Sequence, residues 1–384
     1  MSLRLSVLLV SAFLAVVAAS AAAAPAPDPI DCTGPAGAAA PGTSEWYQRE
    51  AREAWCGEQR ARDTAANPAF QAAGAEAVAR NGGILKEDPF RDPPLLNRSR
   101  FRYEKVSFPD PSGQVLDGYL FRPCDHSCRN MPAGLRAFAP RYPAVVVAHG
   151  GSADQEMYWW GVEPLAEAGY MVLTFQVPTA QNTGPAAFFG DTTAALDFLT
   201  SRANPHRNEL DSAHIGLAGH SAGGVAVSQV GQQDPRVSAI VSWDRAQSSP
   251  LPPDLSLRTP ALFLTADYNC QQVPVCVPQP YTSPPDPLGP GTKDQDFQRL
   301  RAAGVDTMKV SLRAATHLDF TQFGLVGTGS RYGDAVAEYY TLAWFDRYLR
   351  GAEPDGGAVA AHARRRLTAT TFDDSEDVHN ISAG

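Results

Sequence analysis

The chain has 384 residues and 44% apolar composition, enough for a substantial core in one large domain or two small ones. Its formal net charge is −9 and its basic residues are dispersed, which excludes nucleic acids and anionic membrane surfaces as expected partners.

The first residues have the layout of a secretory signal. Arg4 is followed by an apolar run over residues 5–17 and then by small residues up to Pro25. An uncleaved membrane anchor is the alternative, but the run is shorter than the roughly 20 residues that span a bilayer. We therefore predict a signal peptide over residues 1–24 and a secreted, extracellular protein.

The six cysteines lie in three close pairs along the sequence. Because an exported chain enters an oxidising compartment, three local disulfides are the economical interpretation. The predicted pairs are Cys32 with Cys56, Cys124 with Cys128, and Cys270 with Cys276. Residues 124–128 also include His126 and are an alternative set of metal ligands, but the sequence has no second ligand cluster. We therefore predict disulfides, no metal site and no cofactor.

An N-terminal helical extension is predicted over residues 25–100. Between residues 44 and 82 the sequence is rich in Ala, Glu and Arg, and Trp46, Tyr47 and Trp55 recur at helix-like spacing. A pair of antiparallel strands follows, because residues 101–106 and 115–121 have strand patterns and are joined by a predicted turn.

Short apolar runs then alternate with helical segments. The predicted strands are 144–147, 171–175, 215–218, 239–241, 261–264 and 308–312. The predicted helices are 194–202, 297–303 and 334–349. Strands that are apolar on both faces belong to a mostly parallel, doubly wound sheet covered by helices on both faces. With the leading strand pair, this pattern predicts an α/β-hydrolase fold over residues 101–351.

Two further segments have no regular pattern. The Pro-rich residues 274–290 are predicted to form a long loop. Residues 352–384 are predicted as a C-terminal tail, in which the basic residues 364–366 are interpreted as a solvated cluster.

Ser221 is the predicted nucleophile. It is the serine of a Gly-x-Ser-x-Gly motif that follows the apolar strand 215–218 and precedes a predicted helix. A serine on such a sharp turn has strained backbone geometry, and Gly219 and Gly223 allow the neighbouring segments to approach. The helix after Ser221 also directs unpaired N–H groups and its positive dipole end at the reaction centre.

A serine hydroxyl needs a base to attack a carbonyl at neutral pH, and that base needs an orienting acid. Of the histidines after Ser221, His317 follows a predicted strand, whereas His362 and His379 lie in the predicted tail. Two aspartates, Asp244 and Asp267, follow strands at suitable positions, and their positions alone do not distinguish between them. Asp319 is too close in sequence to His317 to orient it easily.

Oxyanion stabilisation needs preorganised N–H donors. His149, Gly150 and Gly151 directly follow the strand 144–147 and form the expected loop, so we predict the backbone N–H groups of Gly151 and Ala222 as donors. The alternative is that the two glycines are only turn residues. Several aromatic and apolar residues are candidates either for lining an acyl site or for core packing: Met157, Tyr158, Trp159, Trp160, Phe175 and Trp243.

The region from about residue 103 to 351 resembles two groups of secreted α/β-hydrolases. Residues 219–224 and Trp243 resemble the polyester hydrolase, cutinase and bacterial lipase group. The spacing from Ser221 to Asp244, residues 260–268, and His317 followed by Asp319, Phe320 and Phe323 resemble the platelet-activating-factor acetylhydrolase group.

The two resemblances imply different acids. The cutinase-like pattern implies an acid two positions beyond Asp267, where this chain has Asn269. The acetylhydrolase-like pattern implies Asp244, which we therefore predict. Both patterns imply Gly151 as an oxyanion donor.

These residues predict a monomeric serine carboxylester hydrolase of the esterase or lipase type. Its substrate would be a small-molecule, lipid or polyester ester, and it would act through an acyl-enzyme intermediate. Peptide or amide hydrolysis is an alternative, since the same triad would serve it. A noncatalytic binding protein on a hydrolase fold is the second alternative, because a fold alone does not determine function.

Overall fold

A computed structural model of the chain describes residues 100–124, 141–178, 184–245, 250–270, 278–280, 293, 295–321, 331–350, 356–368 and 378–383. The predicted signal peptide and, apart from Arg100, the predicted helical extension lie outside these residues, as does most of the Pro-rich segment. The disulfides predicted for Cys32 with Cys56 and for Cys270 with Cys276 therefore stay predictions. Cys124 is a buried free thiol, so the structure does not bear out its predicted bond to Cys128, which also lies outside the described residues.

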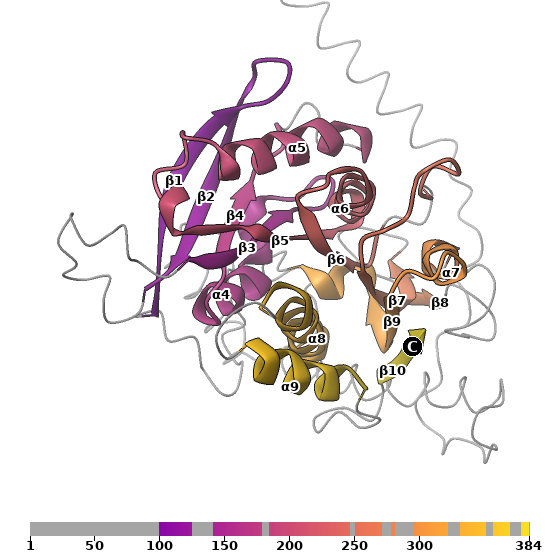
Figure 1. The fold of residues 1–384 in the computed structure, drawn as a ribbon. Helices are drawn as coiled ribbons and strands as arrows, with labels where there is room; N and C mark the ends of the chain where they lie inside the picture. The colour runs from indigo at the N-terminus through magenta and orange to yellow at the C-terminus, as the bar shows by residue number, and fades with distance from the viewer. Residues whose placement is uncertain are drawn as a thin grey trace, which may run out of the picture. The chain divides into compact units, whose positions relative to one another are not determined.

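The described strands form one ten-stranded sheet in the order β1-β2-β4-β3-β5-β6-β7-β9-β10, with β8 paired to β7 (Figure 1). The strands are β1 (Phe101–Pro109), β2 (Val115–Pro123), β3 (Tyr142–Ala148), β4 (Met171–Phe175), β5 (Leu210–His220), β6 (Val237–Trp243), β7 (Ala261–Cys270), β8 (Pro278–Pro280), β9 (Thr307–Thr316) and β10 (Val378–Ala383). The six strands from β4 to β9 in this order run parallel. Each predicted strand of the parallel sheet is present.

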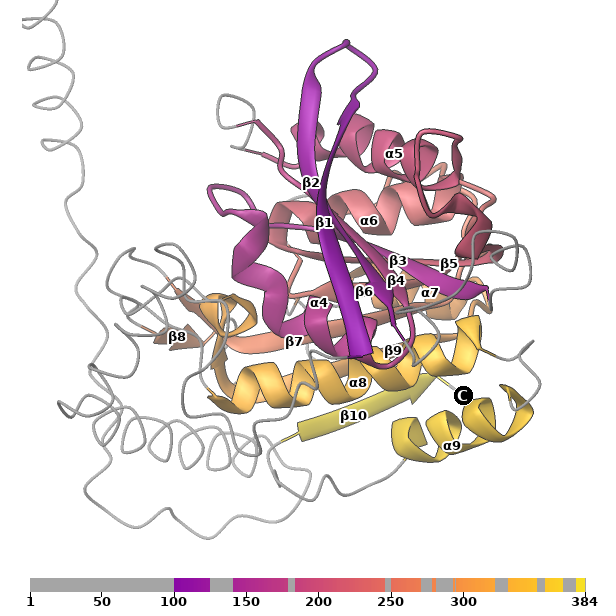
Figure 2. The ribbon, with the colours of Figure 1, turned by 90° about the vertical axis from the view of Figure 1, so that its left-hand side faces the viewer.

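Helices cover both faces of the sheet (Figures 1 and 2). One face packs against α5 (Ala186–Thr200), α6 (Ser221–Gln233) and α7 (Gln295–Ala302), and the other against α4 (Trp159–Glu167) and α8 (Arg331–Leu349). Short 3-10 helices lie at η4 (Gln155–Tyr158), η5 (Arg207–Glu209) and η6 (His317–Phe320). Because both faces are covered, consecutive residues such as Val145 and Val146 are fully buried. The predicted α/β-hydrolase fold is confirmed.

The predicted antiparallel pair is β1 with β2, which are joined by a tight turn. Asp110 stabilises this turn, since its Oδ1 accepts hydrogen bonds from the N–H groups of Ser112 and Gln114 at 2.8 and 2.7 Å. Gly113 has a φ of +87°, which a residue without a side chain adopts readily. The loop sequence therefore sets the register of the hairpin.

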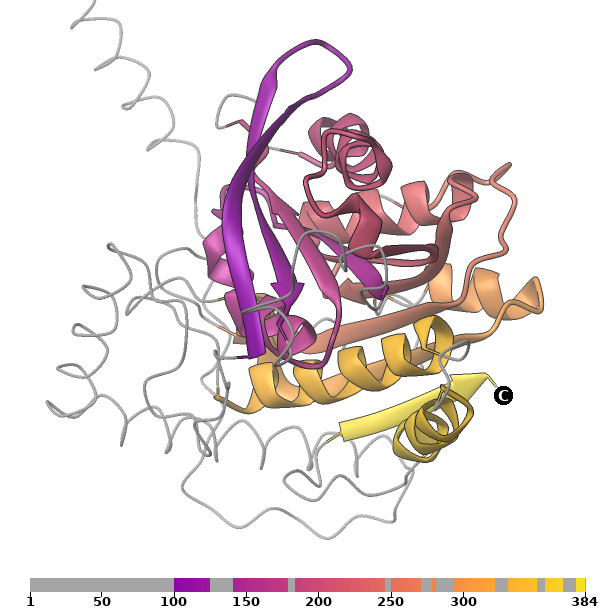
Figure 3. The same ribbon diagram turned by 60° about the vertical axis from the view of Figure 1, so that its left-hand side comes forward.

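The segment predicted as a C-terminal tail contains two elements, α9 (Gly356–Thr368) and β10. Arg366 donates a hydrogen bond to the Tyr339 carbonyl oxygen at 2.9 Å, and its guanidinium lies 4.3 Å from the centroid of the Tyr339 ring. Strand β10 extends the sheet beside β9 (Figure 3). The prediction of a solvated basic cluster is wrong for Arg366, because α8 supplies the surface on which it packs.

None of the described helices is both long and apolar enough to cross a membrane.

Candidate active site

Three non-glycine residues of the described chain have a positive φ, and all three follow strands at one edge of the sheet. Ser152, Ser221 and Asp244 have φ values of 59°, 52° and 38°. They follow β3, β5 and β6, which are parallel neighbours, so the carboxyl ends of these strands meet there. Left-handed conformations are costly for such residues and cluster at functional sites. This edge is therefore the candidate active site, as expected for an open α/β sheet.

Ser221 lies on a tight turn between β5 and α6, and the turn depends on two glycines. A Cβ atom on Gly219 would lie 2.7 Å from the carbonyl oxygen of Gly223. A Cβ atom on Gly223 would collide with the carbonyl oxygens of Ala148 and His149. No side chain fits at either position, so the two glycines allow β5, α6 and the loop after β3 to meet around Ser221.

His317 lies between Ser221 and Asp244. Strand β9 ends one residue before it, which brings its ring to the same edge of the sheet. Its Nε2 is 2.9 Å from the Oγ of Ser221, and its Nδ1 is 2.6 Å from the Oδ2 of Asp244. An ionised carboxylate only accepts hydrogen bonds, so Nδ1 carries the proton and Nε2 accepts from the Ser221 hydroxyl. In this arrangement an imidazole can remove a proton from serine.

Asp244 is fully buried and has three hydrogen-bond donors around its carboxylate. Its Oδ1 accepts from the N–H of Ala266 at 3.0 Å, and its Oδ2 accepts from Lys293 Nζ at 2.5 Å as well as from His317. Burial raises the pKa of the Asp244 carboxyl, but the Lys293 charge and the His317 hydrogen bond outweigh burial and hold this pKa well below its usual range. Asp244 is therefore ionised at neutral pH.

Of the two aspartates that the sequence left open, the structure brings Asp244 to His317. Asp267 lies in β7, and Asp319 lies in η6, but their side chains are outside the described part of the structure. Lys293 was not predicted. It is an isolated lysine in a stretch of Gly, Pro and Thr, and no sequence pattern marks it as buried.

The loop after β3 passes beside Ser221. A Cβ atom on Gly150 would lie 3.2 Å from the Ser221 Cβ. The Gly150 N–H donates to the Tyr158 hydroxyl at 2.9 Å, so Gly151 is the next donor along the loop. Ala222 lies in the first turn of α6, whose N–H groups have no partner within the helix. Gly151 and Ala222 therefore lie on the two segments that border Ser221, and their roles as oxyanion donors stay predictions.

A directional chain of hydrogen bonds connects this loop to the base. The Tyr158 hydroxyl, which accepts from Gly150, donates to His220 Nδ1 at 2.8 Å, and His220 Nε2–H donates to the His317 carbonyl oxygen at 3.0 Å. Because that carbonyl only accepts, the His220 tautomer is determined. Burial and the neighbouring His317 hold the pKa of His220 well below its usual value, so its ring is neutral. These hydrogen bonds hold the backbone at Gly150 and at His317 in place around Ser221.

The part of the chain that contains Ser221 and Asp244 is similar to known proteins. Residues 137–276 match the family model of PET hydrolase-like proteins. The chain is 32% identical over 129 residues to the bis(hydroxyethyl) terephthalate hydrolase of Streptomyces coelicolor. The aligned residues cover 33% of this chain and 39% of that protein. The predicted resemblance to the polyester hydrolase and cutinase group is confirmed.

The chain is also similar to a cutinase and to a solved esterase structure. Cutinase est2 of Thermobifida alba is 26% identical over 217 residues, covering 53% of this chain and 70% of the cutinase. The solved ferulic acid esterase of Streptomyces cinnamoneus has a TM-score of 0.53 and 20% identity, covering 75% of this chain and 98% of the esterase, and this similarity concerns the fold. The chain spans only about two fifths of the length of the terephthalate ester hydrolase.

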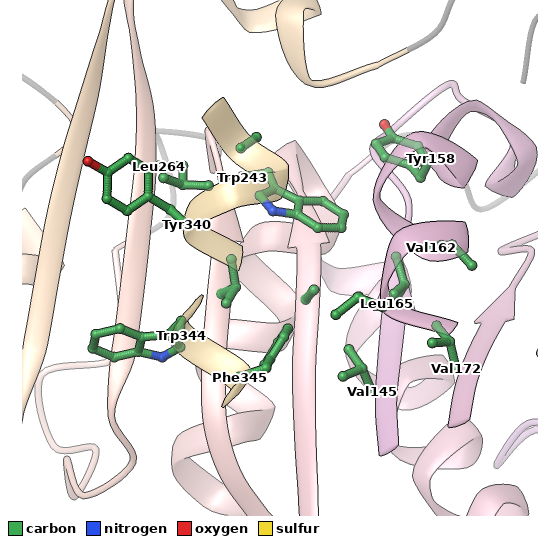
Figure 4. Close-up of a cluster of buried hydrophobic side chains, with 14 of the residues drawn as sticks. Val145, Tyr158, Val162, Leu165, Val172, Trp243, Leu264, Tyr340, Trp344 and Phe345 are labelled. Atoms are coloured by element: carbon green, nitrogen blue, oxygen red, sulfur yellow. The ribbon is translucent and has the colours of Figure 1, made fainter. Parts of the chain in front are cut away.

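The PET hydrolase-like segment, residues 137–276, contains Ser221, Asp244 and the loop after β3, whereas His317 and Lys293 lie beyond it. Most aromatic residues that were candidates for an acyl site in this segment lie in the core. Trp243 is fully buried in a cluster of hydrophobic side chains that also includes Tyr158 (Figure 4). It packs on Trp160 at a centroid distance of 5.0 Å, and its Nε1–H donates to Thr341. Tyr158 and Phe175 are also fully buried, while Met157 is only partly buried.

His149, also in the PET hydrolase-like segment, is held as a neutral ring. Its Nε2 accepts from the N–H of Val177 at 2.9 Å, so its Nδ1–H donates to the carbonyl oxygen of Gly150 at 2.7 Å. A second ring proton would face the Val177 N–H. Burial accordingly lowers the pKa of His149 from 6.5 to about 4, although the Gly150 hydrogen bond opposes this shift.

We expect this histidine to make folding stability depend on pH. Between pH 6.5 and about 4 the unfolded chain binds a proton at His149 that the folded chain does not, so stability falls as the pH falls through this window. The loss is about 2 kcal/mol between pH 7 and pH 5. Urea unfolding at both pH values should show His149→Gln losing less stability than the wild type by this amount. Equal losses in the two proteins would contradict the assignment.

Proposed function

We propose that the chain is a serine carboxylester hydrolase in which Ser221 is the nucleophile, His317 the base and Asp244 the acid. The observation that carries this proposal is the pair of contacts at His317, 2.9 Å to Ser221 Oγ and 2.6 Å to Asp244 Oδ2. The match of residues 137–276 to PET hydrolase-like proteins supports ester bonds, rather than peptide bonds, as the target.

The reaction would proceed in two acyl transfers. His317 Nε2 takes the Ser221 proton while Oγ attacks the ester carbonyl, and the resulting imidazolium is stabilised by the Asp244 carboxylate. The oxyanion is stabilised by the N–H groups of Gly151 and Ala222, with the dipole of α6 adding positive potential. Protonated His317 then gives its proton to the leaving alcohol. Water, deprotonated by the same ring, releases the acid from Ser221.

The substrate class that we propose is a polyester or lipid-like ester processed outside the cell. Similarity to cutinases and to a terephthalate ester hydrolase supports polyester chains. The spacing from Ser221 to Asp244, which resembles that of platelet-activating-factor acetylhydrolases, supports small acyl groups on a lipid. The signal-like residues 1–24 support export. A panel of esters graded by acyl length, with an emulsified triglyceride and a polyester film, distinguishes these substrates.

Labelling by a fluorophosphonate probe tests the proposal directly. An activated serine attacks the phosphorus and is modified, whereas a noncatalytic binding protein with an unactivated serine is not. We expect stoichiometric labelling on the peptide that contains Ser221, identified by mass spectrometry. Heat-unfolded protein is the control, because unfolding separates Ser221 from His317. Absence of labelling in the folded protein would reject a serine hydrolase.

A further inference from the structure

Asp244 has a second charged partner besides His317. Lys293 Nζ lies 2.5 Å from Oδ2, the same carboxylate oxygen that accepts the Nδ1–H of His317 at 2.6 Å. The Lys293 side chain is 4% exposed and that of Asp244 is not exposed at all. A lysine is rarely buried to this extent without a specific role for its charge or its hydrogen bonds.

A second buried ion pair connects the same two segments and helps to fix the position of Lys293. Arg245, the residue after Asp244, pairs with Asp296, three residues after Lys293. The side chains of Arg245 and Asp296 are 5% and 4% exposed. Asp296 Oδ1 also accepts from the N–H of Leu251 at 3.0 Å. The turn after β6 and the segment that enters α7 are thus connected by two pairs of opposite polarity, so Lys293 is held against Asp244 by the fold.

The positive charge of Lys293 changes the net charge of the buried group that contains His317. With Lys293 present, the group of Lys293, Asp244 and His317 is neutral when the His317 ring is neutral, and carries +1 when the ring is protonated. Without the lysine, the neutral ring would leave a buried charge of −1, and protonation would remove it. Since burial penalises net charge, Lys293 favours the neutral ring.

The other described groups that face His317 do not supply this effect. His220 packs against the His317 ring at a centroid distance of 4.4 Å, but burial keeps it neutral. Ser221 contributes only a hydroxyl. Lys293 is therefore the cation in contact with the acid of the described site.

We propose that Lys293 is a positioning residue of the Ser221, His317 and Asp244 relay, which holds the Asp244 carboxylate in place and keeps His317 available as a base at lower pH. This inference rests on the proposed ester hydrolase function. Lys293 lies outside the segment that matches PET hydrolase-like proteins. The inference therefore depends on the structure of this chain and not on that similarity.

The test measures kcat/KM against pH for p-nitrophenyl butyrate hydrolysis, with product read after alkaline quenching. Lys293→Met removes the charge and keeps most of the side-chain stem, and Lys293→Gln keeps a neutral donor in case the first variant does not fold. We expect the acid-side midpoint of the profile to rise by about one pH unit in both variants. Lys293→Arg, which keeps a cation, should restore most of the wild-type profile.

Asp296→Asn is the matched structural control. It loosens the same segment by breaking the ion pair with Arg245, but it removes a negative charge and leaves the Asp244 carboxylate with its lysine. We expect a lower melting temperature without a rise in the acid-side midpoint. The proposal is overturned if the Lys293→Met and Lys293→Gln midpoints stay at the wild-type value, or if Asp296→Asn raises the midpoint equally. Failure of the proposed function is a different result, because the wild type would then neither hydrolyse esters nor label.

Discussion

Ser221→Ala is expected to lower kcat for short p-nitrophenyl esters by on the order of 10⁶-fold, which is the cost of removing the nucleophile in a well-studied serine hydrolase. The methyl group of alanine fits the turn, because Gly219 and Gly223, not the Ser221 side chain, relieve its close contacts. The variant should therefore fold as the wild type does and should lose all labelling by a fluorophosphonate. Single-turnover and steady-state assays on purified protein measure the loss.

Ser228→Ala is the matched control for this variant. Ser228 lies in the same helix, α6, is 2% exposed, and donates its hydroxyl to the Gly224 carbonyl oxygen at 2.6 Å. Its removal should cost about 1 kcal/mol of stability and leave kcat within about threefold of the wild type. If Ser221→Ala retained substantial activity while its fold was intact, the nucleophile would lie elsewhere and the proposed mechanism would be wrong.

The residues themselves predicted the parallel sheet, Ser221 and His317 for physical reasons, whereas the choice of Asp244 over Asp267 came from a resemblance. Strands buried on both faces need continuous apolar runs, such as residues 144–147, and these are visible without a structure. The turn at Ser221 needs glycines at fixed positions. His317 could be found because few histidines follow Ser221 and only one of them follows a predicted strand.

The remaining features depend on contacts between segments that no local pattern records. Asp244 follows β6, and Asp267 lies in the neighbouring strand β7. Tyr268, the residue after Asp267, pairs in register with Thr316, the residue before His317. Strand positions therefore bring both aspartates near His317 and do not distinguish between them. The left-handed backbone of Asp244 directs its carboxylate, and this cannot be inferred from its neighbours in sequence. Strand β10 was missed because β9 determines its main-chain pairing.

Asp244→Asn is expected to lower kcat by on the order of 10⁴-fold, as loss of the orienting acid does in a serine protease. The N–H of Ala266 points at Oδ1, so the amide oxygen of asparagine will occupy that position and its NH₂ group will take the place of Oδ2. There the NH₂ group faces His317 Nδ1 and forces it to accept. The ring proton then moves to Nε2, which can no longer accept the proton of Ser221.

The same substitution places the new NH₂ group against the Lys293 ammonium, so two donors meet in a buried site. Breaking a buried ion pair from one side costs about 3 to 5 kcal/mol, and the melting temperature should fall accordingly. For this reason kcat must be measured at a temperature where circular dichroism shows the variant to be folded.

Asp267→Asn is the comparison, because it removes the other aspartate that the sequence left open. It should keep kcat within a few-fold of the wild type by the geometry at His317, where the Nδ1 proton is already donated to Asp244. A 10⁴-fold loss in Asp267→Asn with an active Asp244→Asn would reverse the assignment and leave the buried Asp244 and Lys293 as a structural ion pair only.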